Sequence, residues 1–207
     1  MEKKKLTIEK IFNSAFENHK KKNNQIAEEL YKKVLKIEPN HFQSTALLGA
    51  LAAQNKNFFL AKKFLQKAIK INPNYAETYN NLGVVLKELG EDQSATNCYK
   101  KAIEINPNNA NSHNNLGIIL SKLGENQKSI NSYKKAIEIN PDYLDAYNNL
   151  GAILVSLGRS IEAEKCFKKV IKLNPNIKKT YEPYGHLLLK LNQHAKGLTY
   201  IKKSTGF

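Results

Sequence analysis

The sequence has only two cysteines and one arginine among its 207 residues. Its apolar runs are all far shorter than the ~18 residues that a membrane-spanning helix needs. Cys98 and Cys166 show no CxxC spacing, which excludes a disulfide framework and a zinc site. The charged start, MEKKKLTIEK, has no apolar segment behind it and so lacks the pattern of a secretory signal peptide. We therefore expect a cytoplasmic protein that does not insert into a membrane.

Catalytic and metal-binding motifs are also missing. The sequence contains no GxSxG elbow, no phosphate-binding P-loop and no HExxH zinc motif. The five histidines are scattered along the chain and none lies beside a cysteine at ligand spacing. We expect no enzymatic activity, no cofactor and no bound metal.

Positive charge is abundant but comes almost entirely from lysine. The formal net charge is +15, and Arg159 is the one arginine among 33 basic residues. Nucleic-acid surfaces usually include arginine, because its planar fork grips phosphates and base edges. Arginine poverty therefore argues against a nucleic-acid partner. The excess of lysine, asparagine and isoleucine is typical of an AT-rich genome, while the charge itself would attract anionic partners at low salt.

The chain is built on a period of 34 residues, a signature of repeat architectures. Five of the six prolines follow this period: Pro39, Pro73, Pro107, Pro141 and Pro175. One glycine column does the same: Gly49, Gly83, Gly117, Gly151 and Gly185. A bulky column runs Tyr31, Leu65, Tyr99, Tyr133, Phe167 and Ile201. We interpret these columns as core positions rather than chemical sites.

Each 34-residue repeat is predicted to form a helical hairpin. In residues 76–109, apolar side chains recur three and four apart in both halves, as expected of two amphipathic helices. Gly90 lies between the halves as a helix stop, and Pro107 ends the second helix. Asn108 and its register mates Asn40, Asn74, Asp142 and Asn176 are predicted to cap the following helices.

This pattern resembles the tetratricopeptide repeat (TPR). The signature in one unit is Tyr79, Leu82, Gly83, Leu86, Ala95, Tyr99, Ala102 and Pro107. The resemblance implies an all-α, right-handed superhelical solenoid of about six hairpins (an α-α superhelix), with first helices on the concave wall. We expect a basic N-terminal tail at residues 1–7 and a TPR array over 8–207. Its repeats are 8–41, 42–75, 76–109, 110–143, 144–177 and 178–207.

The last repeat departs from the pattern at Pro183, which falls inside its predicted first helix. Proline removes a backbone donor and crowds the preceding turn. We therefore expect the helix either to begin at about Glu182 or to be kinked. The sequence carries no signal for an oligomeric state.

Asparagine pairs precede three of the Leu–Gly dipeptides: Asn80 and Asn81, Asn114 and Asn115, Asn148 and Asn149. The resemblance implies that the second member of each pair faces the groove, and we take all six asparagines as candidate residues of a peptide-binding groove. Asparagine offers a donor and an acceptor, so a ladder of Asn81, Asn115 and Asn149 could bond the backbone of an extended peptide. This ladder resembles that in the TPR region of O-linked N-acetylglucosamine transferases. The alternative interpretation is family consensus in an asparagine-rich chain.

The carboxylate clamp of other TPR proteins needs basic residues in the groove. The corresponding positions here are apolar or asparagine, as Phe12, Phe16 and Asn81 show, which argues against that mode. Lysine pairs such as Lys100 and Lys101 fall instead on the second helices.

We therefore expect a non-catalytic scaffold that binds a protein or an extended peptide in its concave groove. One alternative is the substrate-recruiting arm of a larger enzyme, such as a glycosyltransferase, sulfotransferase or iron-dependent oxygenase, which the resemblance also allows. A second alternative is a helical array that binds RNA through its lysines.

Overall fold

The computed structural model describes residues 2–205, which form twelve α-helices and no β-strand. The helices are α1 (Glu2–Lys20), α2 (Asn24–Ile37), α3 (Phe42–Gln54), α4 (Phe58–Ile71), α5 (Ala76–Glu88), α6 (Asp92–Ile105), α7 (Ala110–Lys122), α8 (Asn126–Ile139), α9 (Leu144–Ser156), α10 (Ser160–Leu173), α11 (Lys178–Lys190) and α12 (His194–Thr205). Each odd-numbered helix packs against the even-numbered helix that follows it. The predicted all-α fold of six hairpins is confirmed.

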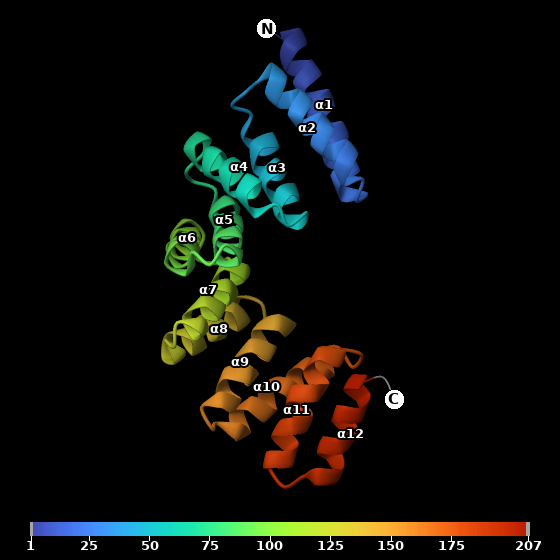
Figure 1. The fold of residues 1–207 in the computed structure, drawn as a ribbon, viewed down its shortest axis with the longest axis vertical. Helices are drawn as coiled ribbons and strands as arrows, with labels where there is room; N and C mark the ends of the chain where they lie inside the picture. The colour runs from blue at the N-terminus through green and yellow to red at the C-terminus, as the bar shows by residue number, and fades with distance from the viewer. Residues whose placement is uncertain (1, 206–207) are drawn as a thin grey trace. The chain divides into compact units, whose positions relative to one another are not determined.

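The chain divides into two compact units, Met1–Pro107 and Asn108–Phe207. Three hairpins form each unit (Figure 1), α1 to α6 in the first and α7 to α12 in the second. Within a unit, the second helix of one hairpin also contacts the first helix of the next, as α4 contacts α5 and α10 contacts α11. First helices of neighbouring hairpins touch as well, for example α3 with α5 and α7 with α9.

The turn within each hairpin contains one residue with left-handed backbone. Gly90, Gly124 and Gly158 have φ angles of 77°, 76° and 73° and supply it without steric cost, which confirms the predicted helix stop at Gly90. In the other three hairpins the same conformation is taken by Lys22, Lys56 and Asn192.

The predicted N-caps need correction. The N-caps lie one residue later than expected, as at His41 and Asn109, whose side chains accept bonds from the Ser44 and Ser112 amides. The predicted caps lie in the preceding turns instead. There the backbone N–H of Asn74, for example, donates to Asn72 Oδ1 at 3.1 Å.

Residues 2–7 were expected to form a tail before the array, but α1 begins at Glu2 and includes them. No proline or glycine occurs in residues 2–7 to stop the helix. Among the described side chains, which start at Lys4, the first buried one is Ile8, so packing begins where the array was expected to begin. At the other end, α11 starts at Lys178 and runs through Pro183, which excludes a helix start at Glu182.

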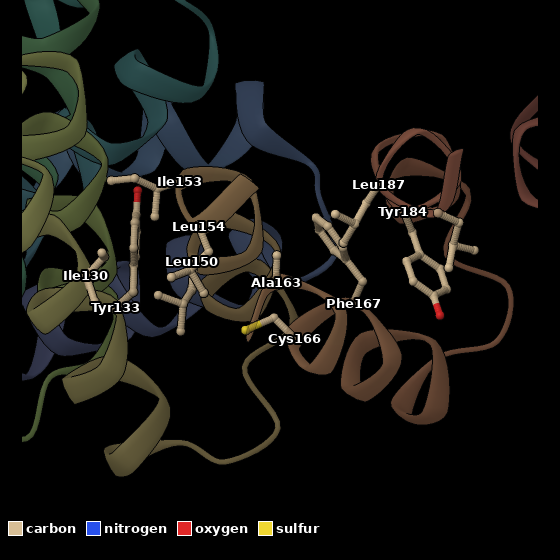
Figure 2. Close-up of a cluster of buried hydrophobic side chains, with 11 residues drawn as sticks. Ile130, Tyr133, Leu150, Ile153, Leu154, Ala163, Cys166, Phe167, Tyr184 and Leu187 are labelled. Carbon is tan, nitrogen blue, oxygen red and sulfur yellow. The ribbon is translucent and has the colours of Figure 1, made fainter. Parts of the chain in front are cut away.

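The core forms where the glycine column meets the bulky column. Tyr99 and Phe167 are each 1% exposed, and a Cβ atom placed on Gly83 would lie 2.6 Å from Tyr99 Cε1. The absence of a Cβ therefore lets the two helices of a hairpin approach closely. In the second unit, Figure 2 shows Phe167 of α10 beside Leu187 of α11, within one cluster of buried apolar side chains. The prediction of core positions is confirmed for the glycine column and for the bulky column up to Phe167, whereas Ile201 is half-buried and the five prolines are exposed.

This packing predicts the effect of Gly117→Ala. Its Cβ would lie 2.6 Å from Tyr133 Cε1, so the ring must move. We expect the free energy of unfolding to fall by about 1–3 kcal/mol, although alanine is the better helix former. The measurement is urea unfolding followed by circular dichroism. In a Tyr133→Ala background the penalty should vanish, and an unchanged penalty there would show that the ring is not its cause.

Candidate functional site

A hollow of about 390 Å³ lies between α1, α3 and α5 in the first unit. We call it the apolar pocket, and its lining is Phe12, Phe16, Phe42, Gln43, Ala46, Leu47, Ala50, Tyr75, Glu77, Thr78 and Asn81. All of these residues belong to the first helices of their hairpins or, like Tyr75, cap one. The three first helices therefore jointly form its wall.

The pocket exists because large and small side chains alternate at equivalent positions. Phe12 and Phe16 on α1 stand 34 residues before Ala46 and Ala50 on α3. The two phenylalanine rings stack with centroids 6.2 Å apart, and at the far end Phe42 meets Tyr75 edge-to-face at 5.1 Å. Both rings and both alanines line the pocket, and the small alanine side chains leave its space open.

The asparagine pair is also replaced in this repeat. Ala46 and Leu47 occupy the places that Asn80 and Asn81 take in the next repeat. Asn81 itself lines the pocket, so the predicted ladder residue of the first unit stands beside an apolar surface. The sequence pattern placed Phe12, Phe16 and Asn81 at groove positions but did not point to Phe42, Tyr75 or Thr78. The loss of the asparagine pair was the signal that could have located the pocket.

In the second unit two of the predicted asparagines bond to each other. Asn149 Nδ2 donates to Asn114 Oδ1 at 3.0 Å, which links α9 to α7. Asn149 also lines a hollow of about 530 Å³, together with Ile118, Ser121, Lys122, Tyr133, Ala152, Ile153 and Ser156. Asn149 is half-buried, whereas Asn114 is only 4% exposed. Asn114 therefore lies in the packing between helices rather than on an open surface.

Asn148 has a similar linking position. Its Oδ1 accepts a bond from Thr180 Oγ1 at 2.8 Å, which joins α9 to α11, and its Nδ2 is buried. Asn80 and Asn115 are half-buried. The groove was expected to hold both members of each pair. Asn114 and Asn148 instead bridge successive first helices, where they can set the orientation of the Asn149 side chain and its neighbours.

Lysines concentrate on the second helices. Helix α4 carries four lysines and no acidic residue, while α3 carries no charged residue. Lys100 and Lys134 are exposed. Other lysines pair locally, such as Lys101 with Glu104 at 2.8 Å and Lys135 with Glu138 at 2.7 Å. Such exposed pairs contribute little to stability.

The two thiols are poor nucleophiles. Burial disfavours the thiolate and raises the pKa of both Cys98 and Cys166 to about 11. Among the described residues no cluster of three or more histidines, cysteines or acids could hold a metal ion. No helix within residues 2–205 is long and apolar enough to cross a bilayer.

We expect Cys98 and Cys166 to react slowly with Ellman's reagent. At pH 7.5 a thiol with its pKa near 11 is ionised roughly a hundredfold less than an ordinary one, because thiolate falls tenfold per unit. The native chain should react at least about a hundredfold more slowly than the urea-unfolded chain, and the rate should rise as the pH approaches 10. Equal rates for native and unfolded chain would contradict the burial of these thiols.

Comparisons with known proteins agree with the hairpin geometry. The family model described as TPR repeat matches residues 63–90, 85–124 and 119–158. Two models described as tetratricopeptide repeat match residues 144–177 and 43–75. No curated protein sequence matches the chain.

Several solved structures share the fold. The crystal structure of MamA is 30% identical, with a TM-score of 0.70 over 80% of this chain and 96% of that one. PilF of Pseudomonas aeruginosa is 15% identical, with a TM-score of 0.85 over 95% of this chain and 90% of that one. YrrB, a TPR protein with an unusual peptide-binding site, is 20% identical, with a TM-score of 0.67 over 84% of this chain and 90% of that one.

Proposed function

This chain belongs to the tetratricopeptide repeat family, whose helical arrays serve as scaffolds for protein interactions, and from that premise we propose a specific binding surface. The chain is a non-catalytic scaffold, and its first helices hold an extended segment of a partner protein. Asn81 in the first unit, and Asn115 and Asn149 in the second, each offer a side-chain amide that can bond the backbone of such a segment. No cofactor or metal takes part.

One observation carries this proposal: Asn81 lines a hollow formed by first helices, and Asn149 lines one formed by the first helices α7 and α9 together with Tyr133 of α8. A half-buried amide beside a hollow can offer both a donor and an acceptor to a chain that enters it. Backbone contacts of this kind tolerate different side chains in the partner. The surface would therefore recognise an extended conformation, with further selectivity coming from the hollows.

Asn114 and Asn148 support the same surface from behind. The bond from Asn149 to Asn114 fixes one amide hydrogen of Asn149 and thereby orients its side chain. The hydroxyl of Thr180 donates to Asn148 Oδ1, which orients the Asn148 side chain and ties α9 to α11. These residues act as positioning residues, because they hold their neighbours rather than touch the partner.

Site-specific photocrosslinking tests the proposal. A benzoylphenylalanine placed at Asn81 or Asn149 should crosslink to a partner segment, which mass spectrometry of the captured chain then identifies. The same group at Lys100 or Lys134, both exposed on second helices, is the matched control. Crosslinks from the two lysine positions alone would overturn the proposal and place the working surface on the second helices.

A further inference from the structure

We propose that the apolar pocket of the first unit holds one large apolar side chain of the partner, an aromatic or branched aliphatic residue, and that a lysine or arginine next to it pairs with Glu77. This inference rests on the proposed function and adds to it the chemical class of the partner residues that bind. It follows from the size of the pocket, from its lining and from its charge.

The size suits a side chain rather than a whole segment. At about 390 Å³ the pocket lies near the lower end of the roughly 300–1,000 Å³ typical of ligand sites. Phe16 and Tyr75 remain 38% and 44% exposed, although both rings have an apolar pocket beside them. Exposed rings beside a concave apolar surface favour the entry of another apolar group, since contact removes both from water.

The charge at the pocket is negative, although the chain as a whole is strongly positive. Glu77 is the one charged residue in the described lining, and it is exposed in the first turn of α5. The nearby cation Lys20 lies over the Phe16 ring at 4.5 Å and is paired with Glu17 at 3.0 Å. A partner cation would therefore be attracted to Glu77.

The repeat itself shows that a lysine can reach a carboxylate at this register. Asp145, two repeats after Glu77, is bonded by Lys179, which stands 34 residues further on. The residue 34 positions after Glu77 is Asn111, and the residue 34 before it is Gln43, so neither offers a charge. The carboxylate at Glu77 thus lacks the lysine that its register mate has, and a partner side chain can supply it.

Three short peptides test the inference in an NMR titration of the full-length, nitrogen-15-labelled chain. They are acetylated, amidated hexapeptides of sequence Gly-Ser-X-Z-Ser-Gly, with X and Z being Phe-Lys, Phe-Glu or Ala-Lys. We expect Phe-Lys to shift the amide signals of the pocket residues. It should bind about two- to fivefold more tightly than Phe-Glu and roughly tenfold or more tighter than Ala-Lys. Equal shifts from all three peptides would overturn the inference.

Two variants of the chain sharpen the test. Glu77→Lys should reverse the order of Phe-Lys and Phe-Glu, and an unchanged order would refute the role of Glu77. Ala50→Ile introduces the isoleucine that the chain carries two repeats later, at Ile118. The larger side chain should fill the pocket and weaken Phe-Lys binding roughly tenfold. Its matched control is Ala53→Val, on the same helix as Ala50 but outside the pocket lining. Valine is the residue that the chain carries three repeats later, at Val155. Equal losses in these two variants would refute the pocket.

This test separates the inference from the proposed function. Crosslinks from Asn81 and Asn149 without any preference for Phe-Lys would leave the groove function standing and refute the pocket chemistry. Specific Phe-Lys binding together with partner crosslinks from the second helices alone would support the pocket and refute the groove function.

Discussion

Phe167→Ala is expected to lower the free energy of unfolding of the second unit by about 3–5 kcal/mol. The Phe167 side chain is 1% exposed and fills the space that Gly151 leaves, where a Cβ atom would lie 2.7 Å from its ring. Its ring centroid also lies 6.0 Å from that of Tyr184 in the next hairpin. Alanine would leave a cavity at a point where two hairpins meet, and both contacts would be lost.

The measurement is chemical unfolding followed by circular dichroism, with Ile161→Ala as the control. Ile161 lies on the same helix, α10, but is 71% exposed, so its truncation should change stability by less than about 0.5 kcal/mol. Similar losses in the two variants would mean that the bulky column is not the core.

The largest effect on binding is expected from the triple variant Asn81→Ala, Asn115→Ala and Asn149→Ala. Each lost hydrogen bond should cost about 0.5–1.5 kcal/mol, so together they should weaken binding roughly ten- to a thousandfold. Calorimetry with the segment identified by crosslinking measures the change.

Circular dichroism controls for the fold of this variant. The three side chains are half-buried, and loss of the bond to Asn114 is the main structural cost that we expect within the second unit. A triple variant that binds within threefold of the parent while folded would show that these asparagines do not hold the partner.

The fold could be predicted because every repeat imposes the same local constraints. The pair of Gly83 and Tyr99 has an equivalent pair in four other repeats. The same steric constraint therefore occurs five times in the sequence, and each time it predicts the same helical hairpin. The ends of elements were less predictable. Residues 2–7 contain no proline or glycine that would mark the start of α1. The predicted N-caps differ by a single residue from the observed ones, such as Asn109.

The site was predicted only in part, because its geometry depends on differences between repeats. The bond from Asn149 to Asn114 joins residues 35 apart, so it crosses from one column of the repeat to the neighbouring one. Comparing residues within a column cannot reveal it. The apolar pocket likewise arises where Phe16 in one repeat corresponds to the smaller Ala50 in the next, a difference that a repeat consensus does not contain.

One comparison tests most directly whether the first helices are the working surface. The affinity for the identified segment is measured by calorimetry at physiological salt for two folded variants: the asparagine triple variant and Lys100→Ala with Lys134→Ala. We predict a loss of roughly ten- to a thousandfold in the first variant and almost none in the second, since exposed charges are screened beyond ~8 Å. Loss of binding in the lysine variant with full binding in the asparagine variant would contradict this prediction.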